Sequence, residues 1–420
     1  MTYRRTFFGI GLGCLLLAAF PSCSRESSAP GDKATARNGA DPNGPAASKA
    51  VSFPTNDAIA YGLRFAAAMS GDEDAVLTQS KAIETVVQAC LKTDVDRAFV
   101  VAKTIKGWQR GSACADVARS FALAGHSNDS RCALLEAEAW CALYREKTRE
   151  TSMGWQVGRI RQHIIIARTA LGETNAYDMV QQPMDNASPA VVNRLVASDT
   201  NRDSSVFLQT LSVILTNKDA EVQQGLSLGI LAWAAKQPVL SPQALDEVVA
   251  VVKSSLQSQP EQHQFAVQQN LVRLLLANGR RDEAEKLTRE LELLVRGMPA
   301  GYQRSASLSE MATVWSQIDT NRTALLFDET RQEIARCPAS AQSYGYAHLG
   351  ECLYEMGQTN RAQSVYRDAV EACILMKQGT PRIQRLVETC ASMAGAGLPL
   401  TPELRNRLEA LLAREEAEKR

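Results

Sequence analysis

Apolar residues in the body of the chain recur three and four residues apart, which is the spacing of an amphipathic α-helix. The stretch "LGECLYEMGQTNRAQSVYRDA", residues 349–369, contains two such apolar faces separated by "GQTN". Gly357 can take the left-handed conformation that ends the first helix, and Thr359 or Asn360 can cap the second. The stretch therefore predicts an antiparallel helical hairpin. Its small residues are packing positions that let the two helices approach closely, not parts of a chemical site.

The same turn recurs along the chain and predicts a series of hairpins. "ETNAYD" begins at residue 173, "DTNRDS" at 199, "DTNRTA" at 319 and "QTNRAQ" at 358. The later intervals fit a period of roughly 40 residues, which is in the range of helical repeat proteins. "SP" at 188 and 241 and "TP" at 401 each supply a capping hydroxyl and a first-turn proline. The alternative to a repeat array is a single irregular helical domain.

Residues 343–374 resemble a tetratricopeptide repeat, and eight residues carry the resemblance. They are Tyr346, Leu349, Gly350, Leu353, Gly357, Ala362, Tyr366 and Ala369. The family's late proline is replaced by Ile374. Neighbouring matches are weaker, and for residues 186–259 a HEAT-like or irregular pair of helices is an alternative. The resemblance implies an all-α fold: an α-solenoid of antiparallel helix pairs over residues 55–420, with the charged C-terminal helix as its cap.

The resemblance also implies where a partner would bind. In tetratricopeptide arrays the first helix of each pair lines a concave groove. Carried onto the three best-aligned repeats, the groove-facing positions are Gln269, Arg273, Ser309, Thr313, Gln317, Tyr344, Glu351 and Tyr354. Polar residues with two tyrosines suit an extended peptide or a partner helix. A merely solvated helix face is the alternative for each of these positions.

Residues 1–23 have the features of an export signal. The basic "MTYRR" precedes "FFGIGLGCLLLAAF", an apolar run that is too short for an ordinary transmembrane helix. "RRTFF" resembles a twin-arginine signal, so general secretory and twin-arginine export both stay open. "FPSCS" resembles a bacterial lipobox and makes Cys23 the candidate lipid attachment residue, although Phe20 and Pro21 depart from that pattern. A plain secretory signal, in which Cys23 is incidental, is the alternative.

Residues 24–54 are predicted to form a disordered tether. Gly, Pro, Ser and Ala dominate the segment, and residues 24–50 contain no Leu, Ile, Val, Met or aromatic residue. Such a segment cannot bury enough surface to offset the entropy of ordering it. With a lipid on Cys23, the prediction is an exported bacterial lipoprotein that faces the periplasm or the extracellular side. It would contact the membrane through its lipid anchor only.

Composition and motifs argue against several other classes of function. The 46 basic and 46 acidic residues give no net charge, which argues against a nucleic-acid surface and a polybasic membrane patch. The four histidines are not spaced as metal ligands, and nucleotide-binding and catalytic motifs are missing. We therefore expect no metal, cofactor, catalytic residue or small-molecule substrate. The eight cysteines of the body lack a C-x-x-C motif and are expected to be buried thiols, with disulfides as the alternative.

These patterns together predict a non-enzymatic, lipid-anchored scaffold that binds a protein or peptide partner at the bacterial cell envelope. The alternative is a helical-toroid enzyme that acts on envelope polysaccharide, which would need two facing carboxylates in a cleft. Paired acids with perturbed pKa values in a cleft would favour the enzyme. A smooth concave groove would favour the scaffold.

Overall fold

The computed structural model describes residues 57–69, 73–149, 153–174, 189–198, 211–217, 219–236 and 240–417. Within these ranges every regular element is a helix and none is a strand, which confirms the predicted all-α class. The signal segment, Cys23 and the tether lie outside the described residues. Contacts divide the chain into two units, Met1–Phe53 and Pro54–Arg420, and all described residues belong to the second.

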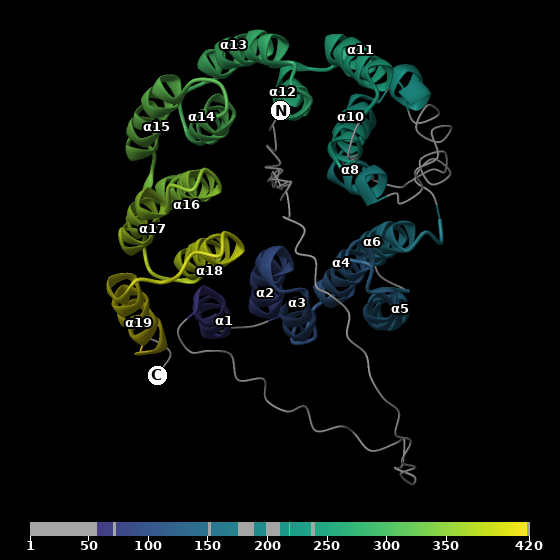
Figure 1. Ribbon diagram of the computed structural model, residues 1–420. Coiled ribbons are helices and arrows are strands. Elements are labelled where there is room, and N and C mark those ends of the chain that lie inside the picture. The colour runs from purple at the N-terminus through teal and green to yellow at the C-terminus, as the bar shows by residue number, and fades with distance from the viewer. Residues whose placement is uncertain are drawn as a thin grey trace, which may run out of the picture. The chain divides into compact units, whose positions relative to one another are not determined.

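The helices of this unit form an inner and an outer series (Figure 1). The inner helices are α2 (Glu73–Thr93), α4 (Gln109–Leu123), α6 (Gly154–Ala170), α8 (Pro189–Ser198), α10 (Ala220–Ala235), α12 (Glu261–Ala277), α14 (Tyr302–Trp315), α16 (Ala339–Glu355) and α18 (Thr380–Gly395). The outer helices are α3 (Val95–Ala102), α5 (Ser127–Thr148), α11 (Pro242–Ser258), α13 (Arg281–Gly297), α15 (Thr320–Ala335), α17 (Thr359–Ile374) and α19 (Pro402–Ala417). Apart from α19, each outer helix packs against the inner helix that precedes it in sequence.

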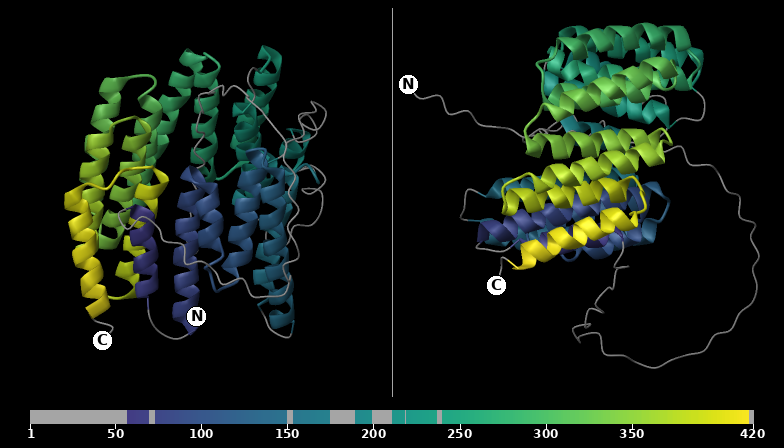
Figure 2. Two further views of the ribbon diagram at one scale, coloured as in Figure 1. Left: turned by 60° about the horizontal axis from the view of Figure 1, so that its bottom comes forward. Right: turned by 90° about the vertical axis from the view of Figure 1, so that its left-hand side faces the viewer.

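The inner helices close a circuit of contacts. Each packs against the next, and α18 packs against both α1 (Ala58–Ala68) and α2 near the other end of the unit (Figure 2). Gly62 lies at a tight contact of α1 with α2, because a Cβ atom there would lie 3.2 Å from Cγ2 of Val86. The sequence predicted that the C-terminal helix caps the array. This helix, α19, packs against α1 and α17, and the first helices of the unit pack against α18.

The α16–α17 hairpin matches the prediction closely. Gly357 has a φ of 73° at the turn, and Ala362 is completely buried between the helices. Gly350 is required by close packing, since a Cβ atom there would lie 2.8 Å from a ring carbon of Tyr366 on α17. The residue that precedes α17 is Gln358, whose side chain makes no capping hydrogen bond, so neither Thr359 nor Asn360 serves as the predicted cap.

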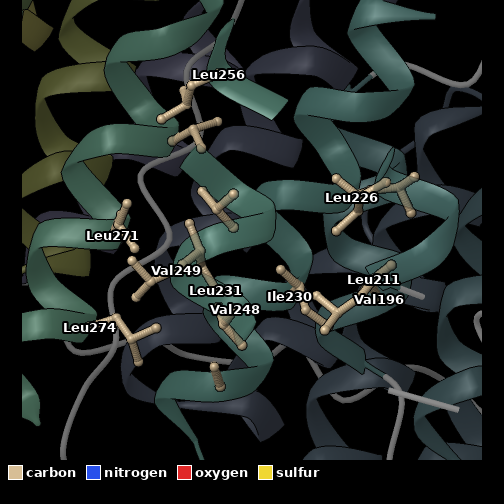
Figure 3. Close-up of a cluster of buried hydrophobic side chains, with 14 of the residues drawn as sticks. Val196, Leu211, Leu226, Ile230, Leu231, Val248, Val249, Leu256, Leu271 and Leu274 are labelled. Carbon is tan, nitrogen blue, oxygen red and sulfur yellow. The ribbon is translucent and has the colours of Figure 1, made fainter. Parts of the chain in front are cut away.

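The region in which the repeat pattern was weakest has an aliphatic core. Figure 3 shows Leu226, Ile230, Leu231 and Val248 among the buried side chains of α10 and α11. Glycines bring α8 and α10 together, because a Cβ atom on Gly229 would lie 2.5 Å from Cβ of the facing valine on α8. All eight cysteines of the body are free thiols, and six of them are buried, as expected for small apolar residues rather than disulfides.

Candidate binding surface on the inner helices

One face of α16 carries a stripe of polar side chains. Tyr344, His348, Glu351 and Glu355 are spaced four, three and four residues apart and therefore lie on the same side of the helix. Gly350 lies on the opposite side, where it packs against α17. The stripe consequently lies on the side of α16 that faces away from the outer helices and toward the neighbouring inner helices.

Charged partners from neighbouring inner helices extend this stripe. We call the resulting group the α16 strip: Lys92, Arg273, Glu310, His348, Glu351 and Glu355. Nε2 of His348 lies 3.4 Å from Oε1 of Glu310 on α14, and its Nδ1 lies 3.9 Å from Oε2 of Glu351. Nζ of Lys92, on α2, lies 3.5 Å from the other oxygen of Glu351. The strip therefore joins helices that are far apart in the sequence.

Two of the three carboxyl groups of the strip have pKa values displaced in opposite directions. Burial alone would raise the pKa of Glu351, but His348 and Lys92 outweigh it and hold that pKa below its usual value. For Glu355 burial prevails over the nearby Arg273 and raises the pKa to about 7. At neutral pH, Glu351 is therefore ionised while Glu355 is near its midpoint.

The other titrating group of the strip is His348. Burial would lower its pKa, but the nearby carboxylates of Glu310 and Glu351 raise it to about 10. The imidazole is therefore a cation at neutral pH, held between two carboxylates.

Glu355 is the exposed acidic group of the α16 strip. Its side chain is open to solvent, although loss of hydration is the largest cause of its raised pKa. A partner could therefore contact Glu355 without first opening the fold, and a basic side chain of a partner would favour its ionised form.

A second polar group crosses the inner helices α2, α4, α6 and α8. We call it the Asp116 strip: Glu84, Gln88, Asp116, His163 and Arg194. The Asp116 carboxylate accepts hydrogen bonds from Nε2 of Gln88 at 2.7 Å and from Arg194, and it lies 2.8 Å from Nδ1 of His163. Asp116 and His163 are both buried. Both Asp116 oxygens are thus engaged, and no substrate or partner can approach them.

Charge in the Asp116 strip is balanced inside the protein. Burial opposes the ionised form of Asp116, but Arg194 and His163 outweigh it and hold the pKa of that carboxyl well below its usual range. Burial lowers the pKa of His163, so this imidazole is neutral and donates its Nδ1–H to the carboxylate. Burial, with a contribution from the charge of Asp116, raises the pKa of Glu84 to about 7. Glu84 accepts a hydrogen bond from the Ser112 hydroxyl at 3.0 Å.

Three of the predicted groove residues do not face an open surface. Ser309 is completely buried and donates to the carbonyl of Ser305 within its own helix. Gln269 and Thr313 are also buried, at 4% and 7% exposure. The assignment placed these residues on a free helix face, whereas the inner helices pack side by side and bury such positions. For these three residues the prediction of an open groove position is corrected.

The other predicted groove residues remain at least partly accessible. Arg273 and Glu351 belong to the α16 strip, and Gln317 is exposed beyond the end of α14. Tyr344 is half-buried in an edge-to-face contact with Tyr302, with 4.7 Å between ring centroids. Tyr354 is half-buried and lies on α16 beside the stripe, not within it. The structure therefore brings Arg273 and Glu351 together and leaves the two tyrosines apart.

Sequence reasoning missed several members of the strip. Glu355 could have been found, because it continues the spacing of Tyr344, His348 and Glu351 by one helical turn. Lys92 could not have been found, because it is 259 positions from Glu351 in the sequence. The two residues come together only because α2 packs beside the last inner helices.

Among the described residues, no cluster of three His, Cys, Asp or Glu side chains is arranged to hold a metal ion. No helix in the described part of the chain combines the length and hydropathy needed to cross a membrane. Comparison with protein-family models, curated proteins and solved structures found no match to this chain.

Proposed function

We propose that the protein is a non-enzymatic scaffold that binds a protein or peptide partner on its inner helices and is held at the bacterial envelope by a lipid on Cys23. In this proposal the helix pairs are tetratricopeptide-like repeats. The α16–α17 hairpin supports this assignment, because Gly350, Gly357 and Ala362 occupy the tight positions that such a repeat requires.

The observation that carries the proposal is the accessibility of the α16 strip. Glu355 is exposed, Arg273 is partly accessible nearby, and neither is sealed within the core as Asp116 is. A surface with separate positive and negative groups suits a partner segment that carries complementary charges. Charge complementarity of this kind fixes partner choice more than affinity.

Charge reversal in the strip tests the proposal. A full-length Cys23→Ser chain, immobilised and incubated with envelope extract, should capture its partner, and Glu355→Lys should abolish that capture. The matched control is Lys286→Glu, which reverses an exposed charge on the outer helix α13. Equal loss in both variants, or no loss with Glu355→Lys, would place the binding surface elsewhere.

The anchor has its own test. Cys23→Ser should release the protein from the membrane fraction after a high-salt wash, since the lipid is the only covalent attachment proposed. Retention of the variant after that wash would contradict lipidation at Cys23, or would show that a partner or another part of the chain holds the protein at the membrane.

A second candidate function is the enzyme that acts on envelope polysaccharide. One observation favours it: Glu351 and Glu355 lie on one helix face with pKa values displaced in opposite directions, as in acid–base pairs. Turnover of isolated envelope polysaccharide that is lost in both Glu351→Gln and Glu355→Gln would support the enzyme. Partner capture without any turnover would support the scaffold.

A further inference from the structure

Aromatic and basic residues gather at one end of the helix pairs α3–α4 and α5–α6. The patch consists of three described segments: residues 103–108 after α3, residues 143–149 at the end of α5, and residues 153–159 at the start of α6. None of the polar groups of the α16 or Asp116 strips belongs to these segments. We call this surface the edge patch.

Contacts between the segments hold the aromatic rings of the patch in place. The rings of Trp108 and Trp155 meet edge to face, with 5.3 Å between their centroids. Nε1–H of Trp140 donates to the carbonyl of Gly107 at 2.9 Å, and the Trp140 ring lies 6.1 Å from that of Tyr144. The aromatic groups are therefore positioned by the fold before any partner arrives.

The patch exposes large apolar side chains that the fold leaves uncovered. Trp155 is 56% exposed, Met153 is 51% exposed and Leu143 is 40% exposed. Single exposed apolar residues are common on soluble proteins. Met153 and Trp155 both lie at the start of α6, where Trp155 meets Trp108, and so they form an apolar tip rather than separate exposed residues.

Basic side chains predominate in the three segments. Their described residues include the exposed Lys103, Lys106, Arg145, Lys147 and Arg149. Arg159 is also exposed, but its charge acts on Glu84 and His163 of the Asp116 strip. The acidic side chain among the same residues is Glu146. Although the whole chain is neutral, this edge is locally cationic, because the fold gathers basic residues that are dispersed along the sequence.

We propose that the edge patch docks onto the surface of an anionic lipid bilayer. Tryptophan and tyrosine favour the boundary between lipid headgroups and acyl chains, and exposed aliphatic side chains gain by entering that boundary. The exposed lysines and arginines of the patch attract anionic headgroups. An anionic polysaccharide would satisfy the cations but would offer no apolar phase to Met153 and Leu143. The docking adds a second membrane contact to the predicted lipid and does not depend on the proposed function.

Tryptophan fluorescence can test the docking in the full-length chain. Every tryptophan lies within the body, so quenching by brominated acyl chains reports on the body even if the apolar N-terminal segment also binds vesicles. A Cys23→Ser chain mixed with vesicles of brominated phosphatidylcholine and phosphatidylglycerol should show strong quenching. Trp155→Phe should lose most of it, whereas Trp233→Phe, on α10, should retain it.

Charge neutralisation provides the second arm of the test. Each lysine near an anionic surface changes partitioning roughly fivefold, so Lys103→Gln with Lys147→Gln should weaken vesicle binding by about 25-fold. Lys286→Gln on α13 should leave binding unchanged. Vesicle binding without quenching of Trp155, or an equal spectral shift with dextran sulfate in the absence of lipid, would overturn the proposal. The Glu355→Lys capture experiment is unaffected by either result.

Discussion

The Asp116 strip and the α16 strip use the same residue types in different surroundings. Each sets carboxylates beside a histidine and a basic side chain, and each joins helices of the inner series. In the first strip, Asp116 is sealed and both of its oxygens have partners. In the second, Glu355 reaches solvent and is near the midpoint of its titration at neutral pH.

This difference shows why residue type alone does not identify a functional site. His163 is neutral and His348 is a cation, although each has a carboxylate beside it. The Arg194 charge on Asp116 compensates that carboxylate and leaves burial to decide the pKa of His163. His348 lies between two carboxylates, which together outweigh its burial. The sealed strip links four inner helices inside the protein, whereas Glu355 of the α16 strip is a group that a partner can contact.

The largest expected effect is that of breaking the sealed strip. Asp116→Ala leaves Arg194 partly buried without its anion, and removing one partner of a buried pair typically costs about 3–5 kcal/mol. Urea denaturation should show this loss of unfolding free energy. Glu138→Gln, which removes an exposed pair with Arg168, should cost no more than about 1 kcal/mol. Equal costs would show that Asp116 is not sealed.

A smaller loss is expected where α17 supports the accessible strip from behind. Ala362→Leu adds three carbons to a completely buried contact with α16, and such overpacking typically costs about 1–3 kcal/mol. Ala139→Leu makes the same change at an exposed position of α5 and should stay within about 0.5 kcal/mol. Thermal and urea unfolding measure both. A neutral Ala362→Leu would mean that the two helices do not pack tightly there.

The smallest effect is a change in pH dependence at Glu355. Its folded-state pKa is raised to about 7, so between its usual value and 7 the folded protein binds more protons than the unfolded chain. Stability therefore falls as pH rises through this window. Glu355→Gln should reduce the difference in melting temperature between pH 5 and pH 8, while Glu84, whose pKa is also raised to about 7, maintains part of it. An unchanged difference would indicate that Glu355 is fully hydrated.

The packing within one helical hairpin was predictable from the sequence. The packing of the first helices against the last inner helix was not. The turn at Gly357 and the burial of Ala362 follow from spacing within one hairpin. The packing of α1 and α2 against α18 depends on residues more than 300 positions apart, and no periodic pattern encodes it. Consequently the sequence could not predict that Lys92 lies beside Glu351. It also could not predict that the segments of the edge patch lie together.

The candidate site was only partly predictable for a related reason. The repeat resemblance located the first helices of the pairs correctly enough to include Arg273 and Glu351. It could not distinguish positions that face a partner from positions that face the next inner helix. Gln269, Ser309 and Thr313 belong to the second kind, because the inner helices bury them side by side.

The most direct measurement of the central claim is site-specific photo-crosslinking in cells. A photoreactive amino acid placed at Glu355 or at Arg273 should form an adduct with the same partner, because both positions belong to the α16 strip. The control position is Leu293 on the outer helix α13, which is 72% exposed and should give no such adduct. An adduct from Leu293 alone, with none from the two inner positions, would contradict partner binding on the inner helices.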